Sequence, residues 1–349
     1  MNLKEYKNQF LNSNRNQTAD LLKGLAVVFM IQVHLIELFA RQDIFNSSVG
    51  SVLLFLGGPP AAPIFMAVMG YYIAQSKKSF LHNLKRGILL FVGGILLNIG
   101  LNLHLLLLIS QGHSQIDPLK LIFGADILPL AGLSIIVISM LKTLNKKNLF
   151  FYLMFAAAVL YIHDITININ LSDSSLLFIQ AFLWGSLDWS YFPLLPWLFY
   201  PMVGFSFKIF IESVNLDQST KDFFGLFTAV ITYVTLNYGI QIAADLNHYY
   251  HHDWLYSMWV VQFLILMVYL AEKIEMWLGK SNILLFIKWL GKNVTAVYVF
   301  QWIIIGNIAT ALYKTQNWVE LFFWFMGICF LVAVLVITFE KLKVKIKTT

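Results

Sequence analysis

The chain has 349 residues, of which 59% are hydrophobic and only 12% are charged, and its mean hydropathy is +0.72. Soluble globular domains carry about 25% charged residues, so this composition excludes them and predicts an all-α, polytopic integral membrane helical bundle. The single cysteine excludes an intrachain disulfide and a thiolate metal cluster.

Ten apolar stretches are long enough to cross a bilayer, which takes about 20 residues. They lie near residues 18–40, 50–75, 84–109, 122–142, 148–163, 190–210, 223–244, 254–272, 284–306 and 319–339. The third is overlong and is expected to tilt or run into the interface, and segment 174–185 is too short to span. We expect a single domain over residues 1–349, with residues 1–17 as a cytoplasmic N-terminal segment and residues 340–349 as a basic cytoplasmic tail.

The cations predict how the chain is oriented. Of the 24 Lys and Arg residues, 21 fall on one side of the ten stretches, and only Arg41, Lys120 and Lys314 fall on the other. Cationic connections face the cytoplasm, so both termini are predicted to be cytoplasmic. This asymmetry explains the net charge of +6 without a nucleic-acid partner. The first apolar run lacks a small-residue cleavage pattern, which favours a retained helix in a bacterial inner membrane and leaves open a eukaryotic organelle membrane.

The first span is apolar but carries a polar stripe. Four ionisable side chains fall on one helical face at about 100° per residue: Asp20, Lys23, His34 and Glu37. A charge in the bilayer core costs at least ~2.5 kcal/mol, so this face is expected to line protein or a wet cavity. Lys23 and His34 lie roughly 16 Å apart along the helix, so the stripe links one membrane surface to a titratable group deep in the other leaflet.

Two later spans contain features that indicate a site. The second is interrupted by GGPPAAP, from Gly57 to Pro63, and two adjacent prolines remove backbone donors and break the helix. Membranes tolerate such a break only where protein or a cavity satisfies the freed carbonyls. The ninth span places Asn293, Tyr298 and Gln301 in the membrane.

Two polar segments on the outer side have ordinary interpretations. The segment HYYHHD, His248 to Asp253, has no histidine pair at i, i+4 framing a glutamate, so we interpret it as a solvated loop and expect no metal site. Asp188 and Trp189, together with Phe192 and Trp197, form an aromatic rim of the kind that stacks on sugars. Such a rim is more often the interfacial aromatic belt, which is the interpretation we favour.

Six stretches occur together in an order that carries a family resemblance. They are DLLKGLAVVFMIQVH (Asp20–His34), AAPIFMAVMGYYIA (Ala61–Ala74), KRGILLFVGGILLN (Lys85–Asn98), GADILPLAGLSIIV (Gly124–Val137), FPLLPWLFYPMVGFSF (Phe192–Phe207) and LGKNVTAVYVFQW (Leu290–Trp302). With them the chain resembles the membrane acyltransferase superfamily, and within it the heparan-alpha-glucosaminide N-acetyltransferase-like branch.

The resemblance implies an acyl-CoA-dependent acyltransferase. In this family an acyl group, usually acetyl from acetyl-CoA in the cytoplasm, passes to a sugar hydroxyl or amine on the far side of the membrane. The expected partners are therefore the lipid bilayer, acyl-CoA and a carbohydrate or glycoconjugate acceptor, with a homodimer left open. Two positions depart from the family pattern, because Lys23 stands where arginine is common and Gln301 stands where many relatives have histidine.

The candidate catalytic residues are His34, Glu37 and Asp126. Acyl transfer needs a base of near-neutral pKa, which imidazole supplies, and the same ring can accept the acyl group as a nucleophile. Glu37, one turn from His34, either orients the ring or pairs with Arg41. Asp126 is expected near the outer face, where it binds the acceptor or holds the base in position.

The candidate donor-binding residues are Lys23, Arg86 and Arg15, with Asn293 placed beside them. Cations suit the phosphates of CoA approaching from the cytoplasm, although topology alone also puts cations at cytoplasmic helix ends. A transporter or lipid-handling protein, with His34 as a proton relay along the same polar path, is the alternative function.

Overall fold

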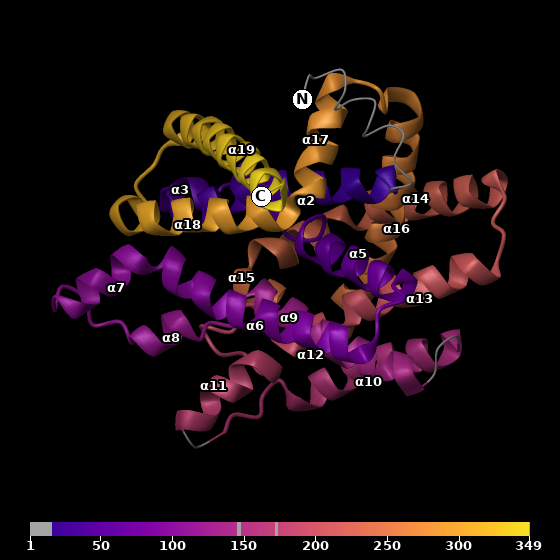
Figure 1. The fold of residues 1–349 in the computed structure, drawn as a ribbon, viewed down its shortest axis with the longest axis horizontal. Helices are drawn as coiled ribbons and strands as arrows, with labels where there is room; N and C mark the ends of the chain where they lie inside the picture. Colours follow the sequence, from indigo (N-terminus) through magenta and orange to yellow (C-terminus); the bar gives the residue numbers. More distant parts are fainter. Residues whose placement is uncertain (1–15, 145–147, 172–173, 349) are drawn as a thin grey trace.

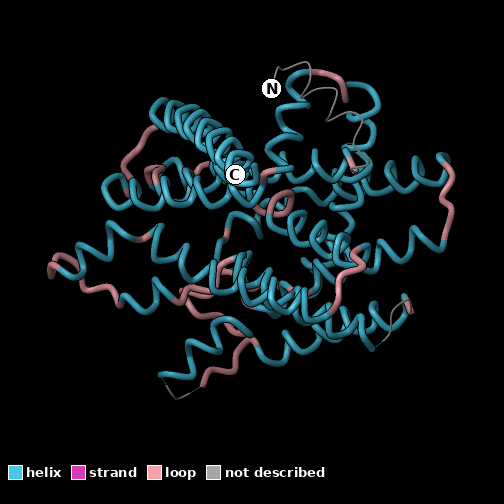
Figure 2. The backbone as a smooth tube through the Cα atoms, in the orientation of Figure 1, coloured by secondary structure: helices cyan, strands magenta, loops and turns pink. Residues whose placement is uncertain are grey.

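The computed structural model describes residues 16–144, 148–171 and 174–348, and it folds them into a bundle of helices (Figure 1). Figure 2 shows these helices joined by loops. Within the described ranges, β pairing is limited to two isolated bridges, Ala40 with Gln316 and Ala125 with Ser190. Ten helical segments of this part of the chain are long and apolar enough to cross a membrane. The predicted all-α polytopic architecture is therefore confirmed.

Short helices alternate with membrane-length ones along the chain. In order they are α2 (Gln17–Leu38), α3 (Gln42–Phe45), α4 (Ser48–Gly57), α5 (Ala62–Gln75), α6 (Phe80–Leu101), α7 (Leu103–Ser110), α8 (Pro118–Ile122), α9 (Ile127–Leu144), α10 (Leu149–Thr166), α11 (Ser174–Leu183), α12 (Leu194–Trp197), α13 (Phe199–Ser213), α14 (Gln218–Ala244), α15 (Leu246–Tyr250), α16 (Trp254–Leu278), α17 (Asn282–Lys292), α18 (Val294–Leu312) and α19 (Trp318–Thr348). The pairs α4–α5 and α12–α13 each make one interrupted span. Residues 340–348 of the predicted basic tail continue α19 as a helix.

The predicted break in the second span is confirmed. α4 ends at Gly57 and α5 begins at Ala62. Around the break, the Gly58 N–H donates to the carbonyls of Leu54 and Phe55, and the Ala61 N–H donates to the Gly58 carbonyl at 3.0 Å. The chain thus satisfies part of its own backbone at membrane depth while changing direction, as a broken membrane helix must.

The prediction of one span over residues 284–306 is wrong. Asn293 separates the short α17 from the spanning α18, and its side-chain amide donates to the Trp289 carbonyl at 3.2 Å. A side chain that bonds local backbone in this way competes with helix continuation. Gly291 also packs against the backbone of Asp20, so α17 lies against the first turn of α2 instead of extending α18.

The overlong third stretch also divides. α6 ends at Leu101, and α7 continues from Leu103 after Asn102, whose side chain donates to the Asn98 carbonyl at 2.9 Å. α6 alone has 22 residues, about 33 Å of helix, which is already the thickness of the bilayer core. α7 therefore extends past the spanning part, and Figure 1 shows α7 and α8 projecting from one end of the bundle.

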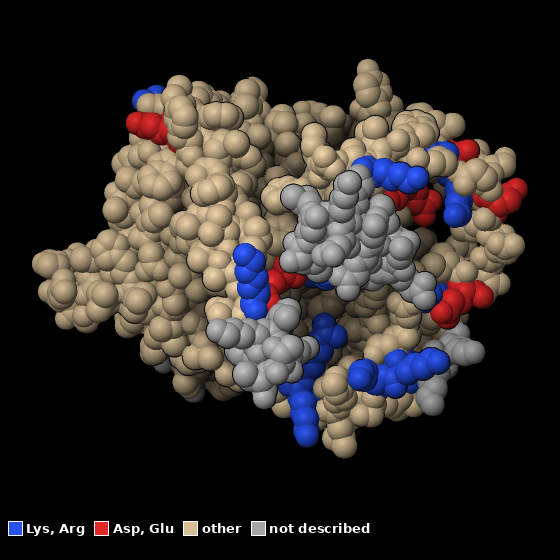
Figure 3. Space-filling view, turned by 45° about the horizontal axis from the view of Figure 1, so that its top comes forward, with Lys and Arg blue, Asp and Glu red and all other residues tan. Residues whose placement is uncertain are grey.

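Charge is concentrated at the opposite end. In Figure 1 the α5–α6 and α13–α14 connections lie at the right-hand end, while the α7–α8 and α18–α19 connections lie at the left. Figure 3 shows most Lys and Arg side chains of its face gathered on one side beside Asp and Glu, with a broad uncharged surface elsewhere. This distribution suits a protein whose flanks contact lipid. The cytoplasmic orientation of the termini remains a prediction.

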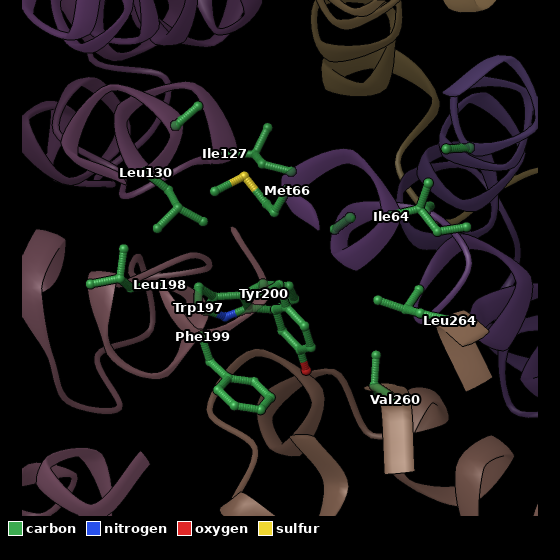
Figure 4. Packing of buried hydrophobic residues seen from close by; sticks show 14 of the residues in the cluster. Ile64, Met66, Ile127, Leu130, Trp197, Leu198, Phe199, Tyr200, Val260 and Leu264 are labelled. Carbon is green, nitrogen blue, oxygen red and sulfur yellow. The ribbon is translucent and has the colours of Figure 1, made fainter. Parts of the chain in front are cut away.

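The core contains a close contact between α5 and α13. Figure 4 shows Met66 of α5 near Trp197 and Tyr200 of the α12–α13 span, all three buried. A Cβ atom at Gly70 would overlap the Pro201 carbonyl oxygen. The backbones of the two helices can approach this closely only because small residues face each other, as is usual between membrane helices.

We expect Gly70→Ala to lower the unfolding free energy by at least about 1–3 kcal/mol, because the added methyl group forces α5 away from α13. The matched control is Gly93→Ala in α6, where a Cβ would meet no atom within 4 Å and alanine favours the helix. Thermal unfolding in detergent measures both. Equal melting temperatures for the two variants would contradict the close contact.

Candidate active site

A cavity of about 750 Å³ lies at the end of the bundle from which α7 and α8 project. Its walls come from α2, the α4–α5 break, the segment from α6 to the start of α9, the loop 189–192, α15 and α18. Buried Met30, Leu54 and Ala62 lie at its inner end, and exposed Ile116 and Tyr313 lie at its rim. The cavity therefore runs inward from one membrane surface to the broken helix.

His34 lines this cavity from the second half of α2. Its ring lies against the indole of Trp302 from α18, with ring centroids 3.8 Å apart and planes inclined by 33°. Its Nδ1 atom is buried and has no hydrogen-bond partner among the described residues. The contact with Trp302 thus holds the imidazole in the cavity wall, and its Nδ1 makes no hydrogen bond to the described residues.

Glu37 lines the same cavity one turn beyond His34. The sequence suggested that Glu37 either orients the His34 ring or pairs with Arg41, and the structure shows neither contact. Arg41 pairs instead with Asp43, at 2.8 Å. The Tyr250 hydroxyl hydrogen-bonds to the Glu37 carboxylate, and the Lys314 ammonium attracts it from beyond α18. Glu37 therefore ties α2 to α15, and in the described structure no bond joins it to the imidazole.

Asp126 immediately precedes α9 and also lines the cavity. Its Oδ1 accepts the Ile127 N–H at 2.7 Å, and its Oδ2 accepts the Tyr298 hydroxyl of α18 at 2.8 Å. Burial raises the pKa of the Asp126 carboxyl, and these two hydrogen bonds oppose the rise. The neighbouring Ala125 N–H donates to the Trp189 carbonyl at 3.0 Å, which holds the loop 189–192 beside the carboxylate.

The prediction of a solvated loop at residues 248–253 is wrong. His252 is fully buried, with its Nδ1 2.7 Å from the Tyr249 carbonyl and its Nε2 2.6 Å from the Tyr200 hydroxyl. A carbonyl only accepts, so Nδ1 carries the proton and Nε2 accepts from Tyr200. Burial lowers the pKa of His252 to about 3, so the ring is neutral at pH 7. His251 is buried beside it, and within the described ranges no three His, Cys, Asp or Glu residues are placed to hold a metal ion.

The aromatic segment 188–197 divides between the cavity and the core. Trp189 lines the cavity, and the Lys120 ammonium lies 4.3 Å from the centre of its ring. Trp197 is fully buried, which the interfacial-belt interpretation did not predict, and its Nε1–H donates to the Tyr250 carbonyl at 2.8 Å. That bond helps to hold α15 in the cavity wall.

Three of the four candidate donor-binding residues, Lys23, Arg86 and Asn293, lie away from the cavity. Lys23 pairs with the buried Asp20 at 2.8 Å, and its Nζ lies 5.6 Å from the centre of the Tyr72 ring. Asn293 is near this pair, because α17 packs on the first turn of α2. Arg86 is exposed on α6, which packs chiefly on α9. Arg15 lies outside the described residues.

Three cavity residues were not predicted as site residues, Tyr250, Tyr298 and Trp302, and neither was Lys314, which is not part of the lining but attracts the Glu37 carboxylate. Tyr298 and Trp302 are one helical turn apart, so the helical periodicity of the ninth span was the signal for that pair. Tyr250 and Lys314 carried no such signal, because they approach the carboxylate of Glu37 only through tertiary packing. Gln301 is fully buried and does not line the cavity.

The fold and the cavity together define a membrane protein, with ten membrane-length helical segments in its described part, in which a histidine and two carboxyl groups line one cavity. Residues 15–224 match the family described as heparan-alpha-glucosaminide N-acetyltransferase, catalytic. This match covers more than half of the chain, so the protein belongs to that family of membrane acetyltransferases. Comparison with curated proteins and with solved structures finds no match.

Proposed function

We propose that this protein transfers an acetyl group from cytoplasmic acetyl-CoA to a hydroxyl or amine of a carbohydrate or glycoconjugate on the opposite side of the membrane. The observation that carries the proposal is the meeting of His34, Glu37 and Asp126 on one cavity, with the buried His34 Nδ1 not bonded by the described residues. Membership of an acetyltransferase family supports the reaction type.

His34 supplies the proton transfer in this mechanism. The imidazole takes a proton from the acceptor hydroxyl or amine as the acceptor atom forms its bond to the thioester carbonyl carbon. The carbon–sulfur bond then breaks, and CoA leaves as a thiolate that takes up the proton. In the alternative route the acetyl group passes first to His34 and then to the acceptor. Mass spectrometry for an acetylated His34 distinguishes the two routes.

Asp126 and Tyr298 position the acceptor in this account. Their hydrogen bond joins the start of α9 to α18 on the wall of the cavity that His34 also lines. A carboxylate held by two donors keeps unused lone pairs, which suit an acceptor hydroxyl or ammonium. Glu37 supports the site by fixing Tyr250 and α15.

The donor reaches this site from the other end of α2. Lys23 lies 11 residues before His34, so the helix separates them by about 16 Å. The phosphates of CoA bind near Lys23, Asn293, Arg86 and Arg15, and the pantetheine arm extends along α2 toward the broken helix. The cavity lining stops at Met30 and Ala62, so α2 and α5 must separate locally to admit the arm.

Removing the Lys23 charge is expected to weaken acetyl-CoA binding about tenfold, the effect of losing one charge-assisted phosphate contact. Lys23→Ala alone would strand the buried Asp20 carboxylate, so the test variant is Asp20→Asn with Lys23→Gln. Lys208→Gln is the control, because Lys208 also forms a helical ion pair, with Glu212 at 3.2 Å. Isothermal titration calorimetry gives the dissociation constants, and equal values for the two variants would remove Lys23 from the phosphate site.

Turnover with purified protein tests the activity itself. Acetyl-CoA is incubated with saccharides and saccharide-bearing lipids, the released CoA thiol is measured, and acetylated product is identified by mass spectrometry. We expect CoA release that requires both the protein and an acceptor. Absence of acetyl-CoA binding, together with solute uptake into proteoliposomes that needs no acyl-CoA, would replace this proposal with the transporter or lipid-handling alternative.

A further inference from the structure

Several aliphatic side chains of the α6–α8 segment line one part of the cavity, which we call the aliphatic side. Leu101 and Leu105 at the α6–α7 junction and Ile116 and Leu121 around α8 line it. Asn98 and Asn102 of the same stretch also line the cavity, as do the catalytic candidates, Trp189 and Tyr191. The cavity therefore offers aliphatic surface beside polar groups.

The aliphatic side continues onto uncovered surface. None of the described residues of α7 or α8 is buried, and Leu103, Leu107 and Leu119 are 51%, 52% and 47% exposed. α7 follows α6, a helix of 22 residues or about 33 Å, so these leucines lie toward the outer end of this span. An apolar surface therefore leads from the lipid boundary to the cavity rim.

Polar side chains hold this side of the cavity in place. The Asn98 amide donates to the carbonyls of Ile122 and Gly124 at 3.1 and 2.9 Å, which fixes α8 to α6. The Asn307 amide donates to the Gly100 carbonyl at 2.8 Å, which fixes α6 to α18. Hydrogen bonds thus hold the aliphatic side in a fixed position in the cavity wall.

A cation lies beside the aliphatic side. Lys120 of α8 lines the cavity next to Leu121, is exposed, and lies over the Trp189 ring. No ion pair joins Lys120 to a carboxylate within the described part of the chain. Its ammonium group is therefore available to an anionic group of a ligand.

We propose that the acceptor is a saccharide joined through a phosphate to a hydrocarbon chain. The sugar lies toward His34 and Asp126, the phosphate contacts Lys120, and the chain leaves over Leu105 and Ile116 along α7 and α8 to the bilayer. This inference rests on the proposed function, because it identifies the acceptor of the same site.

The test uses binding and not turnover. The probe is glucosamine linked through phosphate to a farnesyl chain that carries a diazirine, added to the full chain in lipid nanodiscs and photolysed. We expect labelling concentrated in residues 101–121, and about tenfold less labelling in Lys120→Gln and in Leu105→Asn with Ile116→Asn. Val234→Asn, at a 73% exposed position of α14, is the control and should leave labelling unchanged. A phosphate-free version of the probe should be insensitive to Lys120→Gln.

Labelling spread over the lipid-facing helices and unaffected by Lys120→Gln would overturn the inference, since it would reflect only partition into the bilayer. The binding result does not depend on catalysis. If the protein captures the probe at residues 101–121 but never releases CoA, the binding site is supported and the proposed activity is refuted. A protein that acetylates free saccharide but captures the probe nonspecifically refutes only the lipid-linked acceptor.

Discussion

His34→Ala is expected to reduce acetyl transfer by about 10²–10⁴-fold, the range that a general base contributes, while acetyl-CoA binding stays unchanged. The loss follows from the position of the imidazole, which lines the cavity and carries a buried nitrogen that the described residues leave unbonded. CoA release under saturating acetyl-CoA measures the rate, and calorimetry measures donor binding.

The variant also removes a ring that stacks on Trp302, so its folding must be checked separately. His104→Ala is the matched control, because His104 is an exposed histidine that bonds to Asn307 outside the cavity. Added imidazole should restore part of the activity of His34→Ala but leave His104→Ala unaffected. Full activity in a correctly folded His34→Ala protein would show that another group moves the proton.

Asp126→Asn and Tyr298→Phe are each expected to lower kcat/KM by about 10- to 100-fold, which corresponds to one or two lost hydrogen bonds to a charged group. Because the two side chains bond directly at 2.8 Å, the double variant should be little worse than either single one. Tyr161→Phe, on the exposed face of α10, is the control. Strictly additive losses would mean that Asp126 and Tyr298 act independently and do not form one positioning unit.

Apolar length was enough to predict the spanning helices, because membrane crossing requires it of each segment separately. The sequence also predicted the break before Pro63, since prolines act locally. The division at Asn293 was missed because an average over an apolar window does not register one side chain that bonds the Trp289 carbonyl.

Local signals were weaker for the site. The stripe on α2 correctly placed His34 and Glu37 on one face, because residues three apart lie on the same side of a helix. The partner of Glu37 was not predictable in this way. Tyr250 reaches it only because α15 packs into the bundle through Trp197 and His252, and nothing in the segment HYYHHD distinguishes that packing from exposure to water.

The most direct test of the central claim is the sidedness of transfer in sealed proteoliposomes. Radiolabelled acetyl-CoA is added outside to vesicles whose protein has its Lys-rich end outward, and glucosamine, free and lipid-linked, is enclosed inside. We expect labelled acetyl on the enclosed acceptor and CoA left outside with the native protein, and neither result with His34→Ala. Acetylation only when donor and acceptor share one compartment, or transfer that persists in His34→Ala, would contradict the proposed function.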